Sequence, residues 1–138
     1  IATKEQFDLL EKYIKGRHAT GGMAGITFNE YKDMVESSPV STIIIEYREE
    51  NGRLVGAALT DQLEDSFSMV YSFFDISSET SKRSLGVYIV LNHVEIAKTR
   101  GLDHTYLGYL VKDSPKMSYK TNFKPLEVLT LNGWKLVK

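Results

Sequence analysis

The chain opens with two segments in which apolar residues recur at helical spacing. The first predicts a helix over Thr3–Lys15, followed by the glycine-rich loop Gly16–Gly25, whose first glycine is expected to end that helix. The second helix is predicted to begin at Thr27, because Thr27 and Glu30 have the spacing of a capping box, and to end before Pro39. The chain is therefore expected to start with two helices.

Apolar residues then alternate with polar ones, as is typical of strands. Strands are predicted over Thr42–Arg48, Arg53–Thr60 and Ser66–Phe74. Asn51-Gly52 separates the first two and predicts a hairpin with a type I′ turn. The three strands are therefore expected to form an antiparallel meander.

A third helix is predicted over Ser84–Arg100 and is closed by Gly101. A strand over His104–Val111 follows it. A helix that joins two strands usually makes them parallel neighbours, so this strand is expected to lie beside Ser66–Phe74. The apolar stripe of the helix consists of Val87, Val90, Leu91, Val94 and Ala97.

The last part of the chain predicts one short helix and one hairpin. Ser114 and Pro115 have the character of a helix cap and first helical position, for a helix that reaches about Asn122. The hairpin strands, on either side of a second Asn-Gly turn, are Leu126–Thr130 and Trp134–Val137.

The order of these elements resembles the fold of the GCN5-related N-acetyltransferases, the GNAT fold. This is an α+β fold with a mixed, mostly antiparallel sheet, a central pair of parallel strands that splay apart, and flanking helices. In that fold the acyl donor lies in the gap between the two strands, with its phosphates near the start of the crossing helix. A helix start suits an anion because it offers N–H groups and a partial positive charge. The resemblance implies one domain over residues 1–138.

Composition fits one folded domain, with 42% apolar and 25% charged residues in 138. No apolar run is long enough to span a membrane, and the first residues lack a signal-peptide pattern. We therefore expect a cytoplasmic protein with no membrane partner. Cysteine is absent, which excludes disulfides and thiolate metal sites in this chain. His93 and His104 lack the spacing of metal ligands, so no metal site is predicted.

Charge is distributed unevenly, although the net charge is only −1. From Lys98 to the end the chain has 8 Lys or Arg and 3 Asp or Glu, whereas the preceding residues have 9 and 15. A basic segment on an acidic body indicates a local site for a polyanion. Chance clustering on a solvated face is the alternative.

The segment Lys82–Tyr88 opens the third helix. Acetyl-CoA enzymes of the GNAT fold carry a pyrophosphate loop of the form Arg/Gln-x-x-Gly-x-Gly/Ala at this place, and Arg83 and Gly86 match it. Tyr88 replaces the second small residue and would crowd a pyrophosphate. An acetyl-CoA-dependent N-acetyltransferase is therefore an alternative and not the first expectation.

Several short motifs cover nearly the whole chain in order. They are Gly16-Arg17-His18-Ala19 with Gly21-Gly22-Met23, Ser68–Asp75, Arg83–Gly86, Tyr106-Leu107-Gly108-Tyr109, Lys116–Lys120 and Phe123–Glu127. Together they resemble the C-terminal domain of the aminoacyl-tRNA–protein transferases, most closely the bacterial aspartate/glutamate leucyltransferases, which are related to the arginyl-tRNA–protein transferases. That family also has a cysteine-rich N-terminal domain, to which a metal or iron–sulfur cluster is attributed. This chain has no counterpart of it, so no cofactor is expected here.

The resemblance implies transfer of leucine or arginine from aminoacyl-tRNA to the α-amine of a protein that begins with Asp or Glu. The modified protein then enters degradation by the N-end rule pathway. The ester is already activated, so the enzyme must mainly position the amine and stabilise the oxyanion. Without cysteine or a Ser/His/Asp arrangement, we expect direct attack in a ternary complex. A non-catalytic module that binds acidic N-termini is a further alternative.

The donor side of the expected site lies at the start of the third helix and in the basic segment. Backbone N–H groups at the helix start would meet the terminal adenosine or its phosphate, although a plain helix cap is the alternative. Two lysines on one face of the short helix suit tRNA phosphates, and a solvated face is the alternative. The residues expected on this side are Arg83, Ser84, Leu85, Gly86, Tyr109, Lys116 and Lys120.

The acceptor side is expected around the end of the strand Ser66–Phe74. Tyr71, Asp75 and His18 are the catalytic candidates, with Asp75 orienting the amine or acting as base. A strand-end Asp is also a common turn former. Arg17 and Lys116 are candidates for reading the acidic side chain of the protein substrate. For Arg17 the alternative is a structural salt bridge.

Overall fold

The structure is a computed structural model that describes residues 1–17, 23–77, 84–108, 120 and 123–137. The chain divides into two compact units, Ile1–Tyr106 and Leu107–Lys138. Each unit is described by itself. The prediction of one domain over 1–138 stays a prediction.

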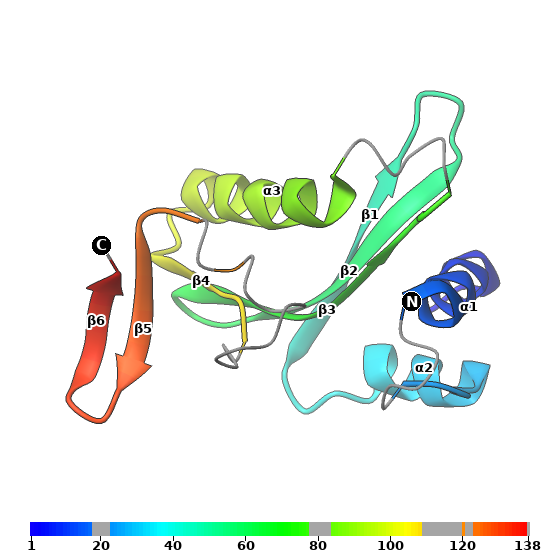
Figure 1. Cartoon of the computed structure of the whole chain (residues 1–138). Helices are drawn as coiled ribbons and strands as arrows, with labels where there is room; N and C mark the ends of the chain where they lie inside the picture. Colours follow the sequence, from blue (N-terminus) through cyan, green and yellow to red (C-terminus); the bar gives the residue numbers. More distant parts are fainter. Residues whose placement is uncertain (18–22, 78–83, 109–119, 121–122, 138) are drawn as a thin grey trace. The chain divides into compact units, whose positions relative to one another are not determined.

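The described residues of the first unit form one four-stranded sheet with the order β1-β2-β3-β4 (Figure 1). Its strands are β1 (Ser41–Arg48), β2 (Leu54–Gln62), β3 (Ser66–Phe74) and β4 (His104–Tyr106). The first three pair antiparallel, and β4 pairs parallel with β3. The predicted meander and the predicted parallel pair are therefore confirmed.

The pairing of β3 with β4 is short in the described residues. β3 is nine residues long, but its pairing with β4 covers only Ser66, Phe67 and Ser68. β4 ends at Tyr106, earlier than the predicted Val111, and Leu107 and Gly108 are not in a strand. Residues 109–111 lie outside the described part of the chain. From Met69 to Phe74, β3 thus runs on beyond the residues that pair with β4, and the predicted splay of the two strands stays a prediction.

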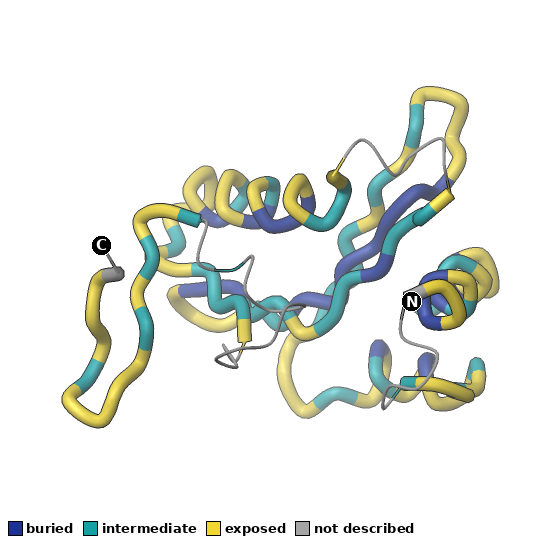
Figure 2. The backbone as a smooth tube through the Cα atoms, in the orientation of Figure 1, coloured by how far each residue is buried: buried dark blue, intermediate teal, exposed yellow. Residues whose placement is uncertain are grey.

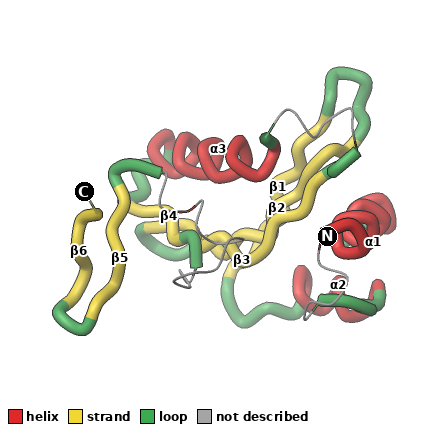
Figure 3. Tube along the Cα trace, in the orientation of Figure 1, coloured by secondary structure: helices red, strands yellow, loops and turns green. Residues whose placement is uncertain are grey.

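Helices lie on both faces of the sheet, as Figures 1 and 3 show. The helices α1 (Lys4–Arg17) and α2 (Phe28–Glu36) cover one face, and α3 (Leu85–Thr99) covers the other. The main core lies between α1, α2 and the sheet, where Leu10, Tyr31 and Phe73 are at most 1% exposed (Figure 2). This layering leaves the end of β3 between α1 and the first turn of α3.

α2 begins as the sequence predicts. The Thr27 side chain accepts a hydrogen bond from the Glu30 N–H at 3.1 Å, and the Glu30 side chain accepts one from the Thr27 N–H at 3.0 Å. This reciprocal capping box satisfies two N–H groups at the helix start.

The end of α1 differs from the prediction. The helix runs through Gly16 to Arg17, so Gly16 does not stop it. A Cβ atom at Gly16 would overlap the side chain of Ile76, which packs over this turn. The glycine is therefore explained by a close approach, and the loop predicted from Gly16 begins later. Residues 18–22 of that loop lie outside the described residues.

The β1–β2 turn was predicted as type I′, and this is wrong. A type I′ turn needs positive φ at both Asn51 and Gly52, but Gly52 alone of the two has it, at 89°. The Gly52 N–H donates to Glu49 O at 2.9 Å, and the Glu49 N–H donates to Arg53 O at 2.9 Å. The loop therefore has three residues and ends with a glycine in the left-handed region.

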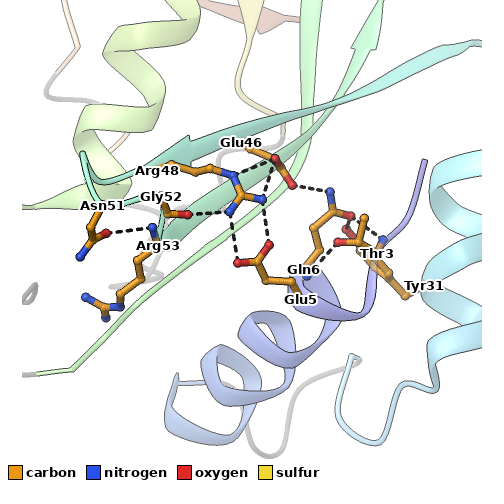
Figure 4. Close-up of polar contacts among 9 residues, drawn as sticks. All are labelled: Thr3, Glu5, Gln6, Tyr31, Glu46, Arg48, Asn51, Gly52 and Arg53. Atoms are coloured by element: carbon orange, nitrogen blue, oxygen red, sulfur yellow. Dashed lines mark hydrogen bonds and ion pairs between the residues drawn. The ribbon is translucent and has the colours of Figure 1, made fainter.

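A polar network ties α1 to β1 (Figure 4). The Arg48 guanidinium donates to both carboxylate oxygens of Glu5, at 2.8 and 3.1 Å, and also to Glu46. The buried Gln6 side chain donates to Glu46 at 2.8 Å and accepts from the Tyr31 hydroxyl at 2.9 Å. The network thus fixes the start of α1 against β1 and α2.

The buried face of α3 differs from the predicted stripe. Its buried residues are Ile89, Val90, His93 and Ala97, so the predicted stripe is right only for Val90 and Ala97. Val87, Leu91 and Val94 are instead 40–54% exposed. Apolar residues surround α3 so evenly that periodicity alone gives no unique buried side.

This difference predicts unequal effects of substitution on α3. Ile89→Ala is expected to lower the free energy of unfolding by about 2–5 kcal/mol, because Ile89 is fully buried. Leu91→Ala is expected to cost less than about 1 kcal/mol, since this side chain is already half exposed. Urea unfolding of the two variants tests this, and equal losses would contradict the assignment of the buried face.

The described part of the second unit is a hairpin of β5 (Leu126–Thr130) and β6 (Gly133–Val137). This confirms the predicted final strands, with Gly133 in the left-handed region at the turn. Most of the predicted short helix Ser114–Asn122 lies outside the described residues. In the parts of the chain that the structure describes, no helix is long and apolar enough to cross a membrane.

Candidate functional site

The end of β3 meets the start of α3 in the first unit. A Cβ atom added at Gly86 would lie 3.2 Å from two atoms of the Phe74 ring, so the first turn of α3 packs directly on this strand. We call the group Tyr13, Tyr71, Phe74, Asp75 and Ser84–Gly86 the β3–α3 site. It contains the part of β3 that extends beyond the paired segment with β4.

Three aromatic side chains from α1 and β3 pack together in the β3–α3 site. The Tyr13 ring lies 4.9 Å from the Phe74 ring and 6.3 Å from the Tyr71 ring, both edge to face. Burial, with a smaller contribution from Tyr13, raises the pKa of Tyr71 to about 12. The Tyr71 hydroxyl therefore keeps its proton at neutral pH and suits hydrogen-bond donation better than proton abstraction.

Asp75 ends β3 and is held in a turn. Its carboxylate accepts a hydrogen bond from the Ser77 N–H at 2.8 Å and forms an ion pair with Arg53. Partial burial raises the pKa of Asp75, but the hydrogen bonds from Ser77 and the positive charges of Arg53 and Lys12 outweigh it. The net pKa is lowered, so Asp75 is a carboxylate at neutral pH and a weak base.

The Arg53–Asp75 ion pair predicts how the pKa of Asp75 changes when Arg53 is replaced. Arg53→Met should raise the pKa of Asp75, because burial then opposes fewer interactions that favour the carboxylate. Lys12→Met is the matched control and should raise it less, since Lys12 contributes least. Carboxyl carbon NMR titration measures both values. An unchanged Asp75 pKa in the Arg53 variant would contradict the role of this pair.

The start of α3 has an unusual backbone. Ser84 precedes the helix with φ 50° and ψ 52°, the sole non-glycine residue with positive φ among the described residues. Its side chain makes no capping hydrogen bond, and the first turn contains no acidic residue. Such strained positions are often found at ligand-binding sites. The N–H groups of a first helical turn have no partners within the helix and suit an anion.

Tyr88 lies in the first turn of α3, and its ring contacts β1. Its ring packs edge to face on Tyr47 of β1, with centroids 5.8 Å apart. Gly86, by contrast, faces Phe74 of β3. The Tyr88 ring thus packs toward β1, whereas Gly86 packs on β3, and whether Tyr88 crowds a pyrophosphate stays a prediction.

Contacts through Tyr13 and Phe74 connect the predicted site residues Tyr71 and Gly86. Tyr71, Asp75 and Ser84–Gly86 belong to the β3–α3 site, and Arg17 is the last residue of α1. Lys120 is half-buried in the second unit, where burial lowers its pKa. Outside the described residues lie His18, Arg83, Tyr109 and Lys116. The functional roles of all these residues stay predictions.

Sequence reasoning missed two residues of this region. Tyr13 lies three residues after Leu10, so the helical spacing of α1 was a signal that it faces the sheet. Arg53 gave no such signal, because its partner Asp75 lies 22 residues away and only the β2–β3 pairing brings them together.

The fold is confirmed by comparison with solved structures. The ribosomal-protein-S18-alanine N-acetyltransferase from Escherichia coli superposes with a TM-score of 0.60, over 96% of this chain and 84% of that one. The sequences are 16% identical, so this likeness concerns the fold alone. The chain thus has the α+β fold of the GNAT acyltransferases.

Sequence comparison identifies the family within that fold. Residues 5–130 match the family described as arginine-tRNA-protein transferase, C terminus, and the chain belongs to this family. The resemblance seen in the sequence motifs is confirmed.

Curated relatives agree with this assignment. The chain is 52% identical to the aspartate/glutamate leucyltransferase of Hyphomonas neptunium over 97% of its length, and 47% identical to that of Sphingomonas elodea over 99%. It covers 54% of each of those proteins, so the chain spans about half the length of the relatives that it matches.

Proposed function

We propose that this chain is the catalytic part of an aminoacyl-tRNA–protein transferase that moves leucine, or arginine, onto N-terminal Asp or Glu. The observation that carries the proposal is the family match over residues 5–130, together with relatives near 50% identity that are named aspartate/glutamate leucyltransferases. The partners are then an aminoacyl-tRNA and a protein with an acidic first residue, and the place of action is the cytoplasm.

The reaction forms one amide bond and breaks one ester bond. The neutral α-amine of the acceptor attacks the ester carbonyl carbon of the aminoacyl-tRNA. The tetrahedral oxyanion collapses, and the terminal ribose hydroxyl leaves on the tRNA after taking up a proton, while the amine loses one. The protein needs to align the two reactants and to stabilise the negative charge that develops on oxygen.

The β3–α3 site offers groups for both tasks. The protonated Tyr71 hydroxyl is suited to donate to the oxyanion. The Asp75 carboxylate is suited to orient the acceptor amine, and its lowered pKa argues against a role as the main base. The first turn of α3 is suited to a phosphate or sugar of the donor. Arg17 and Lys116 remain the proposed contacts to the acidic side chain of the acceptor.

The direct test is a transfer assay with purified chain. Labelled leucyl-tRNA and arginyl-tRNA are incubated separately with peptides that begin with Asp, Glu, Asn or Ala. Transfer to the Asp and Glu peptides alone supports the proposal and names the amino acid. Labelled acetyl-CoA is included because the fold is shared with acetyltransferases. Acetylation without aminoacyl transfer would overturn the proposal.

The proposed donor site predicts the effect of removing a charge beside α3. Arg83→Ala is expected to lower kcat/KM for the aminoacyl-tRNA by about 10- to 150-fold, since a charge-assisted contact to phosphate contributes about 1.5–3 kcal/mol. The KM for the acceptor peptide should stay the same, and thermal unfolding controls for folding. Unchanged donor kinetics would refute the role of Arg83.

A further inference from the structure

A groove of about 490 Å³ lies beside the start of α3, on the side that faces β1. Its walls include Tyr47 of β1, Val55 of β2, and Leu85 and Tyr88 of α3. Its volume is within the roughly 300–1,000 Å³ that is usual for small-ligand sites. The groove has no role in the reaction described above, although it shares Leu85 with the β3–α3 site.

Two tyrosine rings form a corner in this groove. The rings of Tyr47 and Tyr88 are 5.8 Å apart between centroids and are inclined by 80°. A flat ring placed in such a corner can stack on one tyrosine and meet the other edge to face, which are the two favoured aromatic geometries. Tyr88 is 53% exposed, so this aromatic surface is accessible.

The Tyr47 side chain is held in place by contacts with α3. The Tyr47 hydroxyl donates to the Asn92 side chain at 2.8 Å and lies 3.4 Å from the His93 ring. Burial raises the pKa of Tyr47, so the hydroxyl stays neutral. The ring is therefore held in position before any ligand arrives, which lowers the entropy cost of binding.

The charged residues that line the groove are already paired with neighbours. Arg48 contacts Glu5 at 2.8 Å and Glu46 at 3.1 Å, and Glu49 contacts Arg53 at 2.7 Å. Glu46, Glu49 and Arg48 together leave the lining with a small excess of negative charge, which disfavours a phosphate or carboxylate in the groove. The groove therefore suits a neutral, planar group with polar edges.

We propose that this tyrosine groove binds an unpaired nucleobase in the single-stranded 3′ end of the donor tRNA. The assignment rests on the proposed function, which supplies an RNA end as ligand. A nucleobase is neutral and planar and stacks on tyrosine. Leu85 lines the groove and also belongs to the β3–α3 site. A base bound in the groove would therefore hold the RNA next to the start of α3, and the terminal nucleotide would lie in the β3–α3 site.

The test compares two fluorescently labelled RNA hairpins, one that ends in single-stranded CCA and one that is blunt. Binding to the purified chain is measured by fluorescence anisotropy. Tyr88→Ala should weaken binding of the CCA hairpin by roughly 5- to 150-fold and leave binding of the blunt hairpin unchanged. Tyr88→Phe should bind like the unaltered chain, since it keeps the ring. Leu91→Ala, also half exposed on α3 but facing outward, is the matched control.

The outcomes separate this inference from the proposed function. Equal binding of both hairpins by the unaltered chain, or unchanged binding by Tyr88→Ala, overturns the groove assignment whatever the transfer assay shows. CCA-dependent binding that requires Tyr88, in a chain that transfers no amino acid, supports the groove and refutes the function. A transfer-competent chain whose kcat/KM is unaffected by Tyr88→Ala also overturns the groove assignment.

Discussion

His93→Ala is expected to lower the free energy of unfolding by about 2–4 kcal/mol, through a cavity and a lost hydrogen bond. His93 of α3 is fully buried. Its Nδ1–H donates to Ile89 O at 2.8 Å, so in the neutral ring Nε2 accepts from the Thr60 hydroxyl at 2.7 Å. Thr60 is also fully buried, and the substitution would leave its hydroxyl without this partner.

Urea unfolding of the purified variant measures this loss. Asn92→Ala is the matched control on the neighbouring position of α3, and it should cost less because Asn92 is only partly buried. A loss below about 1 kcal/mol for His93→Ala would show that the site relaxes around the missing ring. It would also show that the contact with Thr60 contributes little to stability.

The same residue predicts how stability depends on pH. Burial lowers the pKa of His93, while its hydrogen bond to Ile89 opposes this less strongly. The unfolded chain has an ordinary His pKa of about 6.5, so on acidification the unfolded state takes up the proton first. Stability contributed by neutral His93 is therefore present above about pH 6.5 and is lost as the pH falls toward the lower pKa of the folded state.

His93 also shows where periodicity fails. The capping box of α2 followed from a local pattern, and the parallel strand pair followed from the rule that a helical crossover joins parallel neighbours. The buried side of α3 did not, since Val87, Leu91 and Val94 form as regular a stripe as the residues that are buried. The buried side of α3 is the side on which His93 contacts the Thr60 hydroxyl of the sheet. Thr60 lies 33 residues away from His93 in sequence.

The candidate site was predictable to a similar extent. The motifs located the end of β3 and the start of α3, and the structure joins them through Phe74 and Gly86. The direction of Tyr88 was not predictable, because it depends on which side of α3 faces β1. The pairing of Asp75 with Arg53 depends likewise on strand register. It contributes to the lowered pKa of Asp75, which makes this residue a weaker base than the sequence suggests.

Gly86→Val is expected to lower kcat/KM for aminoacyl transfer by about 10- to 100-fold, because displacements near 1 Å at a reacting site have effects of this size. A Cβ atom at Gly86 would already lie 3.2 Å from the Phe74 ring, and the valine methyl groups extend further. Phe74 has little room to yield, since Tyr13 packs on it with centroids 4.9 Å apart. The start of α3 must therefore move away from β3.

Two further variants separate this contact from a general loss of folding. Gly86→Ala adds only the Cβ atom, so its effect on transfer should be smaller than that of valine. Gly86→Val combined with Phe74→Leu should recover part of the activity, because the smaller side chain makes room for the valine. Thermal unfolding of all variants shows whether the fold is kept. A folded Gly86→Val variant with full transfer activity would mean that the packing of α3 on Phe74 does not position the reactants.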